Sequence, residues 1–151
     1  IARDGRSEFH SSSGLIVATG LGSTAWLKSV VTGSVAIARA AMGASSPTPT
    51  PTPTTISTTT TATATATTDY QPMAWDTPAL TFAVREPFPS RTSQASLVWG
   101  RVDAARPLRL RSRMPEGGVI FSDGVEADFL RFTAGLEASI GVAPVSGRLV
   151  V

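Results

Sequence analysis

Apolar residues near the beginning of the chain change from a continuous run to a helical spacing. The run over residues 14–19 is rich in branched side chains, which favours a short strand buried on both faces. Over residues 24–42 the apolar positions, among them Trp26, Val30 and Ile37, recur near one face at helical spacing. The pattern therefore predicts a buried strand, a Gly-rich connection and one helix.

The residues that flank these elements agree with that prediction. Asp4-Gly5 lies at the centre of residues 1–10 and favours a tight turn between two short strands. Ser23 is suited to cap the start of the helix with its side-chain oxygen. Gly43 is suited to the position just past the helix end, where the backbone often turns left-handed.

The second half of the chain alternates short strand-like segments with turn signals. Residues 115–118 (PEGG), Asp123-Gly124 and Ser146-Gly147 mark expected turns between strands. Several short strands at this spacing predict a β-sandwich or a curled antiparallel sheet, so the expected fold class is mainly β with one helix. The expected strands cover residues 79–86, 95–102, 107–113, 118–122, 125–131, 137–143 and 147–151.

A low-complexity tract over residues 45–68 divides the chain. Its Pro-Thr repeat favours extended polyproline II, and its Thr-Ala repeat has no apolar face to bury. We predict a disordered insertion between two ordered pieces, residues 1–44 and 69–151, which together build one domain. Because the chain starts with Ile1 and not with Met, we expect a piece of a longer protein.

Charge and composition narrow the function classes. Lys and Arg number 13 and Asp and Glu 11, for a net charge of +2. The arginines over residues 101–113 alternate partly with apolar residues, as on the solvent face of a strand. The sequence shows no basic patch with stacking aromatics and no apolar run near the ~20 residues of a membrane span. We therefore expect neither nucleic acid nor membrane as a partner, and the lack of cysteine excludes a Cys-based metal site.

The connection between the predicted strand and helix is the strongest candidate site. Gly20 and Gly22 allow a sharp turn and the close approach of a ligand to the backbone. Free amides at a helix N-terminus suit an anionic group, and Trp26 offers a flat surface to a ring. The loop lacks the lysine of a P-loop and the full GxGxxG spacing. From the residues alone, the corner is either a nucleotide contact or a plain turn.

The run over residues 14–29, GLIVATGLGSTAWLKS, resembles the NAD kinase signature D-G-L-I-x-S/A-T-P-T-G-S-T-A-Y-x-x-S. Residues 121–126, FSDGVE, resemble a strand–Asp-Gly–strand element of that family, and residues 84–91 stand where the family has its Arg-Pro return strand. In the family, the loop and helix start hold the bound NAD. The resemblance implies that NAD is bound by Thr19, Gly22, Ser23, Thr24, Ala25, Trp26, Ser29, Asp123 and Gly124.

The resemblance further implies an NAD kinase that converts ATP and NAD into ADP and NADP. This chain would be its carboxy-terminal NAD-binding β-domain, with ATP and Mg²⁺ expected for the full-length enzyme. The family's Gly-Gly-Asp-Gly motif lies in an amino-terminal α/β domain that this sequence does not contain, so we expect no catalytic residue and no activity of the chain alone. A homo-oligomer formed through the β-domain is implied, in the cytoplasm, or in mitochondria for a eukaryotic parent.

The sequence departs from the signature at three places. Ser13 stands where the family has an Asp that reaches the nicotinamide end from a neighbouring subunit. Gly20-Leu21 replaces Pro-Thr, and Trp26 replaces Tyr. The loop is thereby closest to the divergent mitochondrial-type branch of the family, and the departures concern the hydrogen bonds at the ring end of the nucleotide.

Two alternatives come from other classes of protein. A non-catalytic, nucleotide-binding regulatory module predicts NAD or NADP binding without kinase activity. A structural β-sandwich predicts no nucleotide binding, because the Gly-Ser loop would then be turn chemistry. His10, the only histidine, is interpreted as a surface or strand-edge residue. The scattered carboxylates are interpreted as turn or surface groups: Asp69, Asp76, Asp103 and Asp128.

Overall fold

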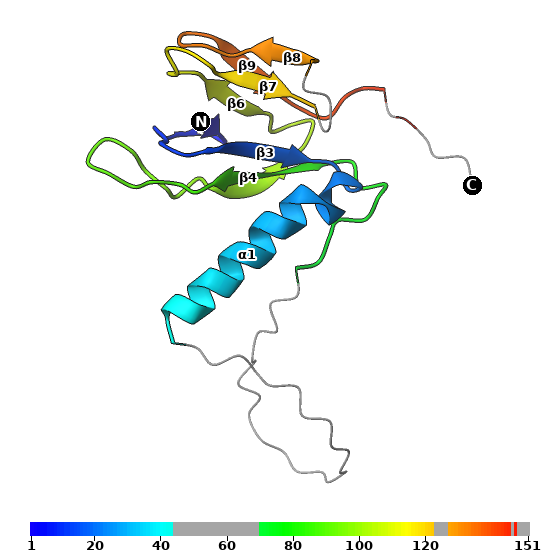
Figure 1. Cartoon of the computed structure of the whole chain (residues 1–151). Coiled ribbons are helices and arrows are strands. Elements are labelled where there is room, and N and C mark those ends of the chain that lie inside the picture. Colours follow the sequence, from blue (N-terminus) through cyan, green and yellow to red (C-terminus); the bar gives the residue numbers. More distant parts are fainter. Residues whose placement is uncertain (44–69, 123–126, 146, 148–151) are drawn as a thin grey trace.

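A computed structural model describes the protein over residues 1–43, 70–122, 127–145 and 147. The spacer, the Asp123-Gly124 turn and the last expected strand lie outside these residues. The described chain forms nine strands in three sheets and one α-helix, which confirms the mainly β fold class (Figure 1). In chain order the elements are β1 (Ala2–Arg3), β2 (Arg6–Ser7), β3 (Gly14–Ala18), the 3₁₀ turn η1 (Gly22–Thr24), α1 (Trp26–Ala41), β4 (Leu80–Arg85), β5 (Trp99–Val102), β6 (Leu108–Arg111), β7 (Val119–Phe121), β8 (Phe129–Arg131) and β9 (Glu137–Ile140).

Two of the sheets face each other across the main core. One has the strand order β2-β1-β6-β9 and the other β3-β4-β5, with every pair antiparallel. Both sheets contribute to one hydrophobic cluster, so they pack face to face as in a sandwich. Its buried residues are Phe82, Leu97, Val102 and Leu108, joined by the partly buried Ile1, Leu15, Val17, Leu80, Leu110 and Ile140.

The central strand β4 is buried on both faces. Phe82 points into the core between the sheets, and the next residue, Ala83, packs with Ala18 and Leu27 in a second cluster. Strand β3 has one neighbour, β4, within the described chain, and its residues 14–17 are only half buried. Leu15 and Val17 pack on the main core, and Ile16 and Ala18 belong to the second cluster, so both faces of β3 are covered by apolar residues. The predicted burial on both faces is therefore confirmed in part, since Ala18 is the one residue of the strand that is buried.

Helix α1 follows η1 and extends away from the sheet (Figure 1). Leu27 is its only fully buried residue, whereas Ile37 is 71% exposed and Trp26 is 45% exposed. The predicted apolar face through Trp26 and Ile37 is thus not the face that packs on the sheet. Gly43 has φ 69° just beyond the helix, which confirms the predicted C-terminal position.

The start of the helix differs from the prediction. The capping position is held by Ala25, and no side chain caps the helix there. Ser23 lies one turn earlier, and its hydroxyl donates to the carbonyl oxygen of Gly20 at 2.6 Å. The predicted Ser23 cap was wrong because residues 22–24 form a 3₁₀ turn before α1 begins at Trp26.

The N-terminal hairpin forms as predicted. Asp4 and Gly5 have φ of 53° and 74°, the conformation that a two-residue turn between twisted strands requires. The turn joins β1 to β2, with Ala2 opposite Ser7.

Strands β6 to β9 form one long, bent ribbon, because backbone hydrogen bonds continue the β6–β9 pairing toward β7 and β8. Ser112 N donates to Leu136 O at 2.8 Å, Ala134 N to Met114 O at 2.7 Å and Phe132 N to Gly118 O at 2.7 Å. Between these last two hydrogen bonds, one strand has three residues, 115–117, and the opposite strand has one, residue 133. The extra residues of 115–117 therefore form a bulge. The predicted turn at residues 115–118 coincides with this bulge, because the backbone bends at residues 115–116, Gly117 has φ 70°, and β6 and β7 run in opposite directions (Figure 1). The chain reverses again between β7 and β8.

Candidate functional site

The corner between β3 and α1 is closed on one side by residues 70–77. A Cβ atom at Gly20 would collide with the carbonyl oxygen of Ala74 and lie 3.0 Å from the Cα atom of Trp75. Glycine is therefore required at this position by the packing of the chain on itself. The close approach to Gly20 that the sequence suggested for a ligand is made by the protein's own backbone.

Replacing Gly20 with alanine is expected to lower the free energy of unfolding by about 1–3 kcal/mol, because the added methyl group must displace rigid backbone. Gly33→Ala is the matched control. A Cβ at Gly33 meets no atom within 4 Å, and alanine is favoured over glycine inside a helix by roughly 0.5–1 kcal/mol. Urea denaturation of the two variants checks this, and equal stability of both would contradict the assigned packing.

Ser23 is fully buried and uses its hydroxyl inside the protein. The oxygen donates to Gly20 O at 2.6 Å and accepts from Met73 N at 3.0 Å. The hydroxyl has a single hydrogen to donate, and this hydrogen is taken. Ser23 thus joins the corner to residues 70–77, and its side chain does not reach the surface.

The backbone amides of the loop also donate hydrogen bonds to acceptors within the loop itself. The amides of residues 22–25 donate to acceptors within residues 19–22 at 2.9 to 3.3 Å. Ser29 N donates to Ala25 O, so the first-turn amides of residues 26–28 have no partner earlier in the helix. An anion at this corner would therefore meet the helix start and not the glycine loop.

The opposite side of the corner is open. A shallow hollow of about 510 Å³, which is largely open to solvent, lies along α1 and includes three residues that the sequence predicted, Thr24, Ala25 and Ser29. Ala25 and Ser29 are four residues apart, as are Thr24 and Lys28, although Thr24 lies in η1 and Ala25 at the capping position before α1. The hollow is lined by Thr24, Ala25, Lys28, Ser29, Thr32 and Gly33.

The electrostatics of the hollow favour a negatively charged group. Lys28 is its one charged lining residue, and the first turn of α1 contains no acidic residue. The positive end of the helix dipole lies at the same place. Sequence reasoning missed Lys28, although its spacing of four residues from Thr24 would place it on the same face.

Trp26 is not among the residues that line the hollow, and one face of its ring is already occupied. The guanidinium carbon of Arg85 lies 5.1 Å from the centroid of the Trp26 ring, within the range of a cation–π contact. Arg85 is the last residue of β4 and pairs with Gly14 at the start of β3. Sequence reasoning did not name Arg85 as a site residue, because its proximity to Trp26 depends on the pairing of β3 with β4.

The remaining predicted residues are placed as follows. Thr19 is exposed, and its Oγ1 accepts from Gly22 N at 3.1 Å, so both residues shape the turn. Asp123 and Gly124 lie outside the described residues. Of the nine predicted residues, the structure therefore brings Thr24, Ala25 and Ser29 together at the hollow, whereas Trp26 contacts Arg85 and does not line it.

Metal ligands and membrane spans were searched within the described part of the chain. No group of three or more His, Cys, Asp or Glu side chains in this part of the chain is placed to hold a metal, and the residues that line the hollow include no carboxylate for Mg²⁺. No described helix is long and apolar enough to cross a membrane.

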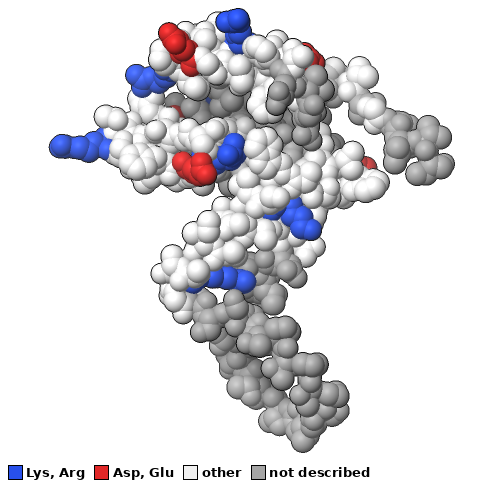
Figure 2. All heavy atoms as spheres, in the orientation of Figure 1, with Lys and Arg blue, Asp and Glu red and all other residues white. Residues whose placement is uncertain are grey.

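The face drawn in Figure 2 carries its described basic side chains apart from one another, within a largely uncharged surface. They do not merge into a continuous basic stripe on this face.

Comparisons with protein-family models, with curated proteins and with solved structures find no significant match to the chain. A functional assignment therefore depends on the residues of the corner and on their geometry.

Proposed function

We propose that this chain is the NAD-binding β-domain of an NAD kinase and that the hollow along α1 is its nucleotide site. One observation carries the proposal. Thr24, Ala25 and Ser29, which match the family signature, line an open hollow whose charged lining residue is Lys28. Lys28 and the amides at the start of α1 suit the pyrophosphate of a dinucleotide.

The other lining residues suit the remainder of such a ligand. Ala25 and Gly33 have little or no side chain, which leaves room for a sugar or a ring close to the helix. The hydroxyls of Ser29 and Thr32 supply donors and acceptors for ribose hydroxyls, whereas the Thr24 hydroxyl, which donates to Leu21 O at 2.9 Å, can only accept. Concave surfaces with a few convergent polar groups are the usual form of a small-molecule site.

The proposal assigns binding, and no chemical step, to this chain. Phosphoryl transfer depends on positioning and on stabilising charge around the transferred group. Lys28 is one cation, and the residues that line the hollow include no carboxylate for Mg²⁺. ATP, Mg²⁺ and the base would therefore be held by the Gly-Gly-Asp-Gly domain that the resemblance implies for the whole enzyme.

The proposal includes self-association through the β-domain. The far end of the β6–β9 ribbon, formed by β7 and β8, pairs with no other strand in the described chain. It exposes large apolar side chains, which are typical of surfaces that another protein covers. These residues are Val119, Phe121, Phe129 and Leu130.

A structural β-domain without a ligand is the second candidate, and two observations favour it. Glycine is required at position 20 by the packing of Ala74 against it, and the Ser23 hydroxyl is already hydrogen-bonded to Gly20 O and Met73 N. Ser23, a signature residue, and Gly20, which departs from the signature, are thereby explained without a nucleotide. A non-catalytic regulatory module shares the binding site of the first candidate and differs from it only in lacking kinase activity.

Calorimetric titration of NAD into the 151-residue chain separates these candidates. The kinase and regulatory candidates predict binding in the roughly micromolar to millimolar range usual for enzyme substrates. Ala25→Trp fills the hollow and is expected to weaken binding at least about tenfold, because a large side chain would occupy the ligand's volume.

Ile37→Trp adds a similar side chain on the same helix outside the hollow, where residue 37 is 71% exposed, and should leave the affinity unchanged. No NAD binding by the unmodified chain would favour the structural β-domain. Equal affinity of the Ala25→Trp variant would remove the hollow as the site. Kinase activity that requires a linked Gly-Gly-Asp-Gly domain would distinguish the enzyme from the regulatory module.

A further inference from the structure

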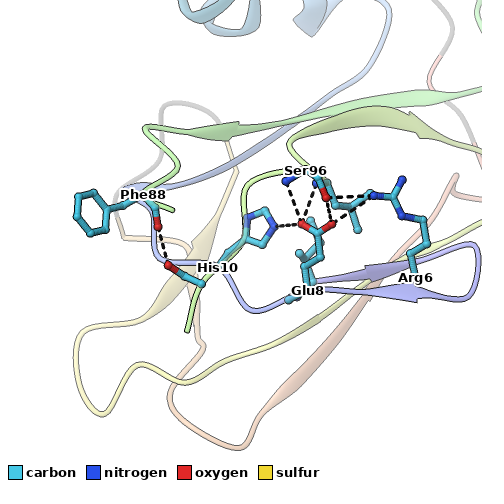
Figure 3. Close-up of polar contacts among 8 residues, drawn as sticks. Arg6, Glu8, His10, Phe88 and Ser96 are labelled. Atoms are coloured by element: carbon cyan, nitrogen blue, oxygen red, sulfur yellow. Dashed lines mark hydrogen bonds and ion pairs between the residues drawn. The ribbon is translucent and has the colours of Figure 1, made fainter. Parts of the chain in front are cut away.

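A buried carboxylate holds the beginning of the chain to the loop before β5. The Glu8 side chain is 7% exposed and accepts hydrogen bonds from four residues (Figure 3). Oε2 accepts from Leu97 N at 2.8 Å, from His10 Nε2 at 3.1 Å and from Ser96 N at 3.2 Å. Oε1 accepts from the Ser96 hydroxyl and from Arg6 Nη2 at 3.3 Å. Every donor is directed at one anionic group.

These contacts lie where two distant segments run together. Glu8 exchanges backbone hydrogen bonds with Ile1, which extends the β1–β2 pairing by one residue pair. Farther along, Gln94 N donates to Phe9 O, and Phe88 N donates to Ser11 O, both at 2.8 Å. Residues 8–13 therefore follow the loop over residues 86–97, and the carboxylate of Glu8 is bonded to that loop at its β5 end.

The arrangement requires the charged form of Glu8. Hydrogen bonding from the Ser96 hydroxyl is the main cause that lowers the pKa of Glu8 to about 2. The Leu97 amide, His10 and the Ser96 amide lower this pKa further, whereas desolvation raises it. The charged or titratable groups that face Glu8 are the Arg6 guanidinium, the His10 ring and the amino group of Ile1.

We propose that Glu8 and its donors Arg6, His10, Ser96 and Leu97 form an acid-sensitive latch, which holds residues 1–13 against the loop 86–97 and opens when the Glu8 carboxylate is protonated. A protonated carboxyl would present a hydrogen toward groups that already donate, so the bonds could not all persist. This inference is independent of any nucleotide site.

The pH range in which the latch opens follows from the direction of the pKa shift of Glu8. The pKa of Glu8 is lower in the folded chain than its ordinary value of 4.5. Its contribution to stability is thus complete above that ordinary value and is lost as the pH falls toward about 2.

Hydrogen exchange of the whole chain, followed by mass spectrometry and corrected for the intrinsic rate at each pH, tests the latch. Between pH 6 and pH 3, segments 1–13 and 93–98 are expected to lose protection before strand β4 does. Glu8→Gln should lower protection of both segments at pH 6 by about ten- to a hundredfold, because an amide cannot accept all of these bonds. Glu116→Gln, a change in an exposed loop, is the control and should leave protection unchanged.

Ser96→Ala keeps the carboxylate and the backbone donors but removes the hydroxyl that lowers the pKa most. In this variant, segments 1–13 and 93–98 should therefore lose protection at a higher pH than in the unmodified chain. If Glu8→Gln does not fold, Ser96→Ala alone tests the latch. Equal protection in the Glu8→Gln and unmodified chains would overturn the latch. An unchanged opening pH in Ser96→Ala, or simultaneous loss of protection in β4 and the two segments, would overturn it as well.

Discussion

Replacing Phe82 with alanine is expected to lower the free energy of unfolding by about 3–5 kcal/mol, the usual effect of removing a buried aromatic side chain. Phe82 is fully buried in the central strand β4 and belongs to the cluster shared by the two facing sheets. Small domains have net stabilities of only about 5–15 kcal/mol. The substitution should therefore remove a large part of the stability, which urea denaturation followed by circular dichroism would measure.

Phe88→Ala is the matched control because it makes the same chemical change at a side chain that is 66% exposed. Its expected effect is within about 0.5 kcal/mol, as for most surface substitutions away from special contacts. Comparable losses in the two variants would mean that the facing sheets do not share the core assigned to Phe82.

Local patterns predicted most of the strands because each strand is short and bounded by turn residues. Strand β4 lies within the predicted range 79–86, and Asp4-Gly5 forms the predicted hairpin turn. The failures concern properties that depend on distant partners. The partial exposure of β3 depends on what packs against each of its faces, and the unequal pairing at residues 115–117 depends on β9 and β8 lying opposite. Glycine and proline mark the turn but do not show that it also forms a bulge against the opposite strand.

The candidate site was predictable to the extent that its residues lie close together in sequence around the start of α1. Ala25 and Ser29 are one helical turn apart and line the same hollow, together with Thr24 of η1. Arg85, by contrast, reaches Trp26 through the antiparallel register that places it opposite Gly14. The packing of Ala74 on Gly20 likewise joins segments that are far apart in sequence. Such contacts determine whether a glycine leaves room for a ligand or for another part of the chain. They cannot be read from the spacing of apolar residues in the sequence.

Leu27→Ala is expected to cost about 2–5 kcal/mol and to loosen α1 from the sheet. Leu27 is the only fully buried residue of this helix, and it packs with Ala18 and Ala83 beneath β3 and β4. Most of the helix beyond it is exposed, so few other contacts could hold it in place. Because the hollow is formed along α1, the proposed nucleotide site further predicts that NAD affinity falls together with the stability.

Ile37→Ala removes a comparable side chain from the exposed part of the same helix, so it controls for helix propensity and for the loss of apolar surface. Its stability and NAD affinity are expected to stay close to those of the unmodified chain. Urea denaturation, together with hydrogen exchange over residues 26–41, would measure both variants. If Leu27→Ala destabilised the protein no more than Ile37→Ala, α1 would be held by something other than Leu27. If Leu27→Ala loosened the helix without lowering the affinity for NAD, the nucleotide would bind elsewhere on the protein.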